Sequence, residues 1–140
     1  VGYVNHQLVR DNMASKVSII VTTSEIYDPH SAAVLFAFGA TAIYPYMMFA
    51  SIKSFYERKN ITNSALQQKL KNSAKAMGAG LLKIMSKMGI ATMASYRNSS
   101  LFDILGLSDE ICNDCFTHAN SDLAGLGYED IEKKNRSFTF

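Results

Sequence analysis

The sequence has little net charge and no long apolar run. Its 14 lysine and arginine residues against 12 aspartate and glutamate residues leave a formal charge of +2, with no basic run of motif length. That balance is too weak to favour a nucleic-acid partner. The longest apolar stretch, residues 32–42, is interrupted by Gly39 and Thr41 and is far shorter than the roughly 20 residues of a membrane span. We therefore expect neither nucleic-acid binding nor membrane insertion.

Cysteine is scarce, and the two that occur, Cys112 and Cys115, form a single C-x-x-C. Without a second pair a four-ligand zinc site is unsupported, and haem attachment would need histidine in place of Phe116. A redox C-x-x-C would sit at a helix N-terminus, whereas residues 109–116 read as one helix, capped by Ser108, with the pair inside it. We expect two reduced thiols on one helix face of a cytoplasmic protein.

Residue groupings typical of catalysis are missing from the sequence. The histidines His6, His30 and His118 are scattered, and no G-x-S-x-G element occurs. Gly78 and Gly80 lie inside a helical pattern and lack a third glycine, which argues against a phosphate-binding loop of the dinucleotide type. The sequence therefore predicts no catalytic, cofactor-binding or metal-binding residue.

One cluster of basic residues has a possible binding role. Lys83 and Lys87 lie one helical turn apart, and Arg97 follows closely in the sequence. Together they predict a possible anion contact. The alternative is a solvated helix face together with an arginine that braces neighbouring carbonyl groups.

The composition is that of an ordinary globular protein, with 48% apolar and 19% charged residues over 140 positions. This length is enough to bury a real core, so we expect one domain over residues 1–140, with an irregular tail at 135–140. Residues 17–22 are β-branched and almost continuously apolar, as in a strand covered on both faces of a parallel sheet. The predicted fold class is α/β and helix-rich, with helices on a small, mainly parallel sheet that is either open or part of a barrel.

Start and stop signals divide the chain into elements. Asp28 and Pro29 open one helix, Gly89 ends the longest one, and Ser100 with Asp103 has the spacing of a capping box. The mid-helix glycines at 78 and 80 predict a kink or close packing there. The predicted helices span residues 1–13, 32–38, 48–56, 63–88, 101–105, 109–116 and 129–134, and the predicted strands span residues 17–22, 42–44 and 91–96.

Residues 80–97 read G-L-L-K-I-M-S-K-M-G-I-A-T-M-A-S-Y-R. They closely resemble G-L-L-K-V-M-S-K-M-G-I-S-T-x-x-S-Y-R of the central domain of the glutamate synthase large (alpha) subunit. Residues 38–46 resemble the same family's Y-G-A-D-A-I-N-P-Y. On this basis the chain is similar to a fragment from the C-terminal half of that domain. Thr22 stands where the family has glutamate, so the resemblance carries no role over to the loop 22–30.

The resemblance implies a parent enzyme that makes L-glutamate from L-glutamine and 2-oxoglutarate with reducing electrons. Glutamine hydrolysis would belong to an N-terminal domain, and FMN and an iron–sulfur cluster to a later barrel domain. The present segment would connect the two and help to wall the ammonia path, with other domains of the same polypeptide as partners. No catalytic or cofactor residue of the family maps onto it, so the fragment alone is expected to be inactive.

Two other classes of function remain open on the sequence. One is a small anion-binding module that uses the basic cluster, and the other is a protein-interaction domain with no catalysis of its own. A parallel sheet cut from its neighbours leaves a bare strand edge. We therefore also expect the isolated fragment to self-associate through that edge or through exposed apolar patches.

Overall fold

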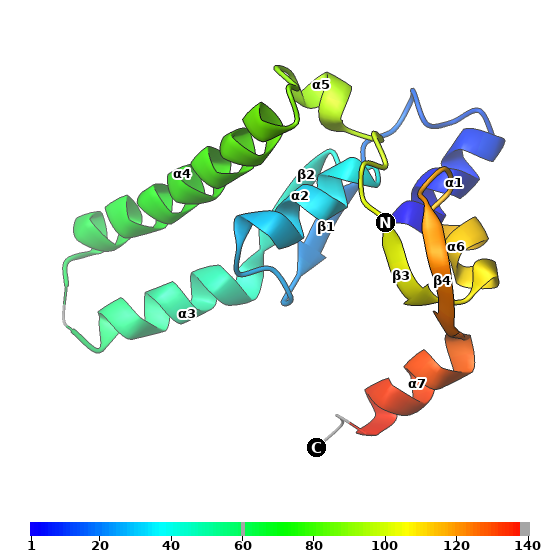
Figure 1. Cartoon of the computed structure of the whole chain (residues 1–140). Coiled ribbons are helices and arrows are strands. Elements are labelled where there is room, and N and C mark those ends of the chain that lie inside the picture. Colours follow the sequence, from blue (N-terminus) through cyan, green and yellow to red (C-terminus); the bar gives the residue numbers. More distant parts are fainter. Residues whose placement is uncertain (60, 138–140) are drawn as a thin grey trace.

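The computed structural model describes residues 1–59 and 61–137. Helices and short parallel strands share the chain, with three consecutive helices between the second and third strands, which confirms the predicted helix-rich α/β class (Figure 1). No helix in the described ranges combines the length and the apolar character needed to cross a membrane. The elements are α1 (Gly2–Arg10), β1 (Ile20–Thr23), α2 (Pro29–Ala37), β2 (Ala42–Pro45), α3 (Tyr46–Glu57), α4 (Asn63–Lys87), α5 (Met93–Tyr96), β3 (Ile104–Leu107), α6 (Asp109–Cys115), β4 (Ser121–Leu126) and α7 (Tyr128–Ser137).

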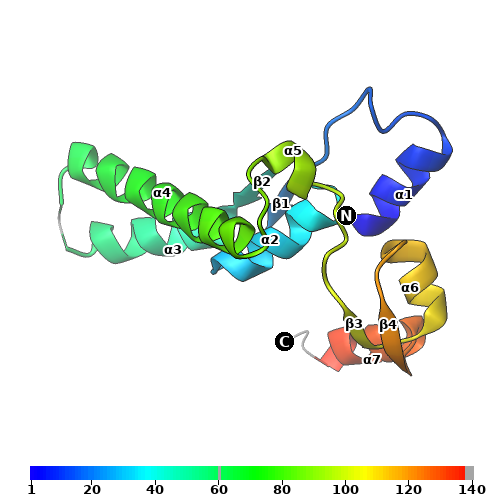
Figure 2. The same ribbon diagram turned by 45° about the horizontal axis from the view of Figure 1, so that its top comes forward.

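The parallel strands form two separate pairs. β1 pairs with β2 from Ile20 opposite Ala42 to Thr23 opposite Pro45, and α2 makes the crossover between them. β3 pairs with β4, with α6 as the crossover and with irregular register. Figures 1 and 2 show the β1–β2 unit beside α2 to α4, and the β3–β4 unit beside α1, α6 and α7. In place of the one small parallel sheet that was predicted, the chain therefore forms two two-stranded sheets. β1 begins three residues later than predicted, because its partner strand begins only at Ala42.

The longest predicted helix is confirmed as α4, and it forms a projecting hairpin with α3 (Figure 1). Thr62 caps α4 by accepting from the backbone N–H of Ala65. Gly89 (φ +72°) adopts the left-handed conformation just past the helix end, and the N–H of Ile90 reaches back to the carbonyl of Met85. Both ends of α4 are thus fixed by the local signals that the sequence carries.

Close packing at the second mid-helix glycine joins α4 to α2. A Cβ added at Gly80 would lie 2.6 Å from Pro29 Cβ, so a side chain has no room there. A Cβ at Gly78 would meet nothing within 4 Å. The helix runs through both glycines as one element. Close packing is therefore confirmed at Gly80.

Two buried clusters hold the elements together. Met85 and Tyr96 pack with Ala33 and Ala37 of α2, and this packing joins α4 and α5 to the β1–β2 unit. Phe38, just after α2, packs with Ile104 of β3 and Cys112 of α6. The rings of Phe38 and Phe116 meet edge to face with centroids 5.0 Å apart. The end of α2 therefore contributes to both clusters.

The strand predicted at residues 91–96 is wrong, because Met93–Tyr96 form the short helix α5. Thr92 Oγ1 accepts from the N–H of Ser95 at 3.2 Å and lies 2.9 Å from Ser95 Oγ. This capping arrangement starts a helical turn. The cap therefore starts a helix where the sequence predicts a strand.

The helix predicted at residues 101–105 is also wrong, since Ile104–Leu107 form β3. Ser100 cannot cap a helix here, because its backbone is left-handed (φ +49°) and its hydroxyl donates to the Thr117 carbonyl. Gly106 (φ +78°) lies within the strand and accompanies a register shift, so it does not end a helix. The partner strand β4 was not predicted, because its polar and glycine-containing sequence resembles a loop.

The predicted tail at residues 135–140 is corrected in part. α7 opens at Tyr128 with Glu129 and Asp130 in its first turn, and it continues to Ser137, beyond the expected end near Lys134. An ion pair between Arg136 and Glu132, one turn apart, extends the helix. Residues 138–140 lie outside the described part of the chain.

We expect replacement of Asp28 to lower the thermal unfolding midpoint of the chain. Its carboxylate accepts from Ser31 Oγ at 2.6 Å, from the N–H of Ser31 at 3.0 Å and from that of His30 at 2.7 Å. These bonds, led by the Ser31 hydroxyl, lower the pKa of Asp28 below its usual value. The stabilisation is complete above the unfolded-state pKa and is lost as pH falls through the lowered folded-state pKa. Asp28→Ala should therefore melt below wild type at neutral pH, and the difference should shrink below about pH 4. A constant difference down to pH 2 would contradict this account.

The two glycines of α4 should respond in opposite directions to alanine. Gly80→Ala should lower the free energy of unfolding by about 1–3 kcal/mol, because the new methyl group overlaps Pro29. Gly78→Ala, the matched control, should raise it by about 0.5–1 kcal/mol, because its Cβ enters open space and helix propensity improves. Urea unfolding measures both. Equal effects at the two positions would show that the contact with Pro29 is unimportant.

Candidate functional site

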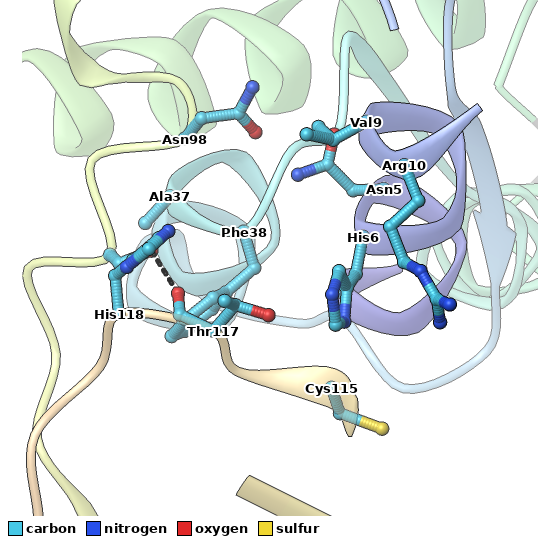
Figure 3. Close-up of a pocket in the computed structure, with 12 residues that line it drawn as sticks. Asn5, His6, Val9, Arg10, Ala37, Phe38, Asn98, Cys115, Thr117 and His118 are labelled. Atoms are coloured by element: carbon cyan, nitrogen blue, oxygen red, sulfur yellow. Dashed lines mark hydrogen bonds between the residues drawn. The ribbon is translucent and has the colours of Figure 1, made fainter. Parts of the chain in front are cut away.

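A polar hollow of about 270 Å³ lies where α1, the end of α2 and two loops meet (Figure 3). The first loop, residues 97–100, follows α5, and the second, residues 116–118, follows α6. Seven of its twelve lining residues have a polar or charged side chain, and within residues 1–59 and 61–137 no carboxylate lines it. The lining residues are Gly2, Asn5, His6, Val9, Arg10, Ala37, Phe38, Asn98, Ser100, Cys115, Thr117 and His118.

Contacts with α6 hold α1 at one side of the polar hollow. His6 Nδ1 lies 3.2 Å from the carbonyl oxygen of Asp114. Gly2 packs against the Cys115 carbonyl so closely that any side chain would overlap it. Contacts with α6 therefore determine where the side chains of α1 lie in the hollow.

Two carboxamide groups converge beside Gly39, which is buried and left-handed (φ +114°) just after α2. A Cβ added there would lie 2.7 Å from Asn5 Cγ and 2.8 Å from Asn98 Oδ1. Glycine thus leaves room for two polar side chains from distant parts of the chain. In Figure 3 they approach each other from opposite sides of the hollow.

The loop 97–100 is bound to the last carbonyl groups of α2. The N–H of Asn98 donates to Phe36 and that of Ser100 to Ala37, at 3.3 and 3.2 Å. Asn98 (φ +60°) and Ser100 (φ +49°) are both left-handed, as is His118 (φ +71°) across the hollow. Of the four non-glycine residues with positive φ in the described chain, three line this hollow.

Tyr96, the last residue of α5, and Arg97, the first of this loop, connect it to α2 and to the β1–β2 pair. The Tyr96 hydroxyl donates to the Ala33 carbonyl at 3.2 Å, and burial raises the pKa of that hydroxyl. Arg97 Nη1 donates to Thr41 Oγ1 at 3.2 Å, and the N–H of Ile19 donates to the same oxygen. Residues 96–100 therefore bind both α2 and the start of the β1–β2 pair.

Of the predicted anion cluster of Lys83, Lys87 and Arg97, only Arg97 takes part in these contacts. Arg97 binds the Thr41 hydroxyl, while Lys83 and Lys87 are exposed along α4. None of the three lines the polar hollow. Their role as an anion contact stays a prediction.

The two cysteines are free thiols and both lie within α6, which agrees with their predicted place in a helix. Cys112 is buried in the second cluster and its Sγ lies 3.5 Å from Ser121 Oγ. Cys115 Sγ lies 3.8 Å from the hydroxyl of Tyr128, which donates to Asp114 at 3.1 Å. These two partners, the thiol first, raise the pKa of Tyr128.

The described side chains do not fit an iron–sulfur cluster or a metal ion. Three or more grouped histidine, cysteine or acidic residues are not found among them, and clusters are held by more thiolates than the two present here. His6 and His118 both line the polar hollow, whereas His30 is exposed on α2. That the segment itself holds no cofactor stays a prediction.

Sequence reasoning missed the polar hollow itself. Its side chains come from four separate segments of the sequence, so no local pattern groups them. The consecutive Asn98, Ser99 and Ser100 were a usable signal, since asparagine favours left-handed turns after a helix. Nothing local indicated that Asn5 would lie opposite.

A family model described as "Glutamate synthase central domain" matches residues 1–108. The chain is 35% identical to "Glutamate synthase [NADH]" of Saccharomyces cerevisiae, with 92% of this chain and 6% of that protein covered. It is 37% identical to "Glutamate synthase [NADPH] large chain" of Azospirillum brasilense, over 95% of this chain and 9% of that protein. With "Ferredoxin-dependent glutamate synthase 1, chloroplastic/mitochondrial" of Arabidopsis thaliana it is 31% identical, over 99% of this chain and 9% of that protein.

The match therefore covers most of this chain but less than one tenth of each of these three relatives. The resemblance seen at residues 80–97 extends well beyond that motif, because the family match begins at residue 1. The chain belongs to the glutamate synthase central domain family.

Proposed function

We propose that this chain is the structural part of a glutamate synthase that connects the glutaminase and flavin domains. The parent enzyme would convert L-glutamine and 2-oxoglutarate into L-glutamate with reducing electrons. The family match and the small share of each relative that the chain covers support this proposal. On its own, the segment would be inactive.

The observation that carries the proposal is the exposure of apolar side chains on both strand pairs. Ile20 of β1 is 69% exposed, and Leu105 of β3 and Leu123 of β4 are 66% and 61% exposed. Parallel sheets are normally covered on both faces, and two strands are fewer than an independent sheet needs. Further parts of the same polypeptide would cover these faces.

The joint at residues 96–100 supports the idea of a spacer with defined geometry. It links the first unit to β3 through a buried tyrosine, backbone hydrogen bonds and the Phe38 cluster. A spacer of this kind would keep two distant active centres at a fixed separation. It would also form part of the wall that guides ammonia between them.

FMN and an iron–sulfur cluster would bind elsewhere in the parent enzyme. This chain has two free thiols, and its described residues contain no group of three or more potential metal ligands. The electron donor would also be selected elsewhere, since relatives similar to this chain carry NADH, NADPH and ferredoxin in their names.

The spacer role can be tested by loosening the joint in the full-length enzyme. In Tyr96→Ala we expect glutamine hydrolysis to continue while less glutamate forms per glutamine hydrolysed, because the buried ring and its bond to Ala33 are lost. Free ammonia should appear in proportion. Tyr27→Ala, at a 59% exposed position, is the matched control and should keep the wild-type ratio. An unchanged ratio in a folded Tyr96→Ala enzyme would contradict the proposal.

The uncovered faces also predict how the isolated 140-residue chain behaves. It should self-associate in sedimentation velocity, and Leu123→Lys should weaken that association by placing a charge on the β3–β4 face. Leu82→Lys is a matched control, since Leu82 is also 61% exposed but lies on α4. A monomer at all concentrations, or equal effects of the two variants, would count against association through the sheet.

A further inference from the structure

We propose that the polar hollow binds a small organic carboxylate. This inference goes beyond the spacer role, because it assigns a ligand to the segment itself. It depends on the side chains that line the hollow, on two carboxamides without hydrogen-bond partners among the described residues, and on the left-handed backbone of the two loops.

The lining favours a negatively charged ligand. Arg10, His6 and His118 line the hollow. Ser100 and Thr117 also line it, but their hydroxyl groups already donate to the carbonyls of Thr117 and Asn113. No aspartate or glutamate of the described chain lines it. The adjacent Asp114 faces His6 with its carbonyl oxygen, while its carboxylate accepts the Tyr128 hydroxyl. A carboxylate ligand could therefore be bound without a competing negative group in the lining.

The two carboxamides supply directed donors. Neither Asn5 nor Asn98 has a side-chain hydrogen bond within the described chain, although both approach Gly39 closely. In Figure 3 Asn5 and His6 lie on one side, from α1, and Asn98 and His118 lie on the other. A carboxylate has two acceptor oxygens, so it can receive one N–H group from each carboxamide.

The backbone at the hollow is held in conformations that non-glycine residues rarely adopt. Asn98, Ser100 and His118 all have positive φ, and they come from the two loops that face each other there. Such residues persist where the surrounding structure fixes them, and they cluster at ligand-binding sites. Here the α2 carbonyl groups fix the first loop, as the bonds of Asn98 and Ser100 show.

The size and charge of the hollow favour a small carboxylate over a larger ligand or a phosphate. A volume of about 270 Å³ lies below the usual range for drug-sized ligands. Its donors are mostly neutral, with Arg10 the single permanently charged side chain in the lining. Neutral donors and one guanidinium suit a carboxylate better than a doubly charged phosphate.

The test uses crystals of the full-length enzyme equilibrated with malonate or with inorganic phosphate over a concentration series. The occupancy of the anion in the hollow, measured at each concentration, then gives the affinity of this site separately from that of any other anion site. We expect malonate between the two carboxamides in wild type. Asn5→Asp and Asn98→Asp should each need at least tenfold more malonate for half occupancy, because each adds a negative charge with little change in shape.

Gln7→Glu is the matched control, because it adds the same charge on α1 at a position that does not line the hollow. It should bind malonate as wild type does. An empty hollow at all malonate concentrations, equal weakening in Gln7→Glu and Asn5→Asp, or tighter binding of phosphate than malonate would each overturn the proposal. These readouts are independent of the coupling ratio that tests the spacer role.

Discussion

The carbonyl groups at the end of α2 accept hydrogen bonds from residues that lie some sixty positions further along the chain. A helix end leaves its last carbonyls without partners inside the helix. Here the N–H groups of Asn98 and Ser100 donate to Phe36 and Ala37 in the last turn. The Tyr96 hydroxyl adds a bond to the Ala33 carbonyl one turn earlier. The same residues then direct the chain from α5 into β3. Satisfying one helix terminus thus determines how the two parallel units are joined.

The core that results is small for a chain of this length. Alanines make up much of the buried set around Tyr96 and Met85, and many larger apolar side chains stay exposed on the strands and on α1. Apolar burial is the main favourable term in folding, so a segment that leaves this much apolar surface uncovered gains less stability alone than in contact with neighbours. This agrees with a chain that matches less than one tenth of each of the relatives described above.

Features decided by a few adjacent residues could be predicted from the sequence. The Asp28 and Pro29 helix start, the Gly89 stop and the Ser108 cap are all present, because each depends on side chains within one turn. The family could also be inferred, from the motif at residues 80–97. The errors at residues 91–96 and 101–105 have a different cause. There, short segments carry ambiguous patterns, and Ser100 is held by carbonyl groups of Ala37 and Thr117 that no local pattern reveals. The polar hollow was beyond sequence reasoning for the same reason, since Asn5 and Asn98 meet only in the folded chain.

The hairpin of α3 and α4 has a mechanical consequence. α4 has 25 residues, and at about 1.5 Å of rise per residue it is a rod of roughly 38 Å. The N-terminal end of α4 lies far from both strand pairs, and its other end carries Met85, packed on Tyr96 (Figure 1). Because α4 also packs on α2 where Gly80 meets Pro29, a sideways load on its N-terminal end would reach the residues that join the two units. A neighbour bound at that end in a longer polypeptide would therefore act on the β3–β4 unit without contacting it.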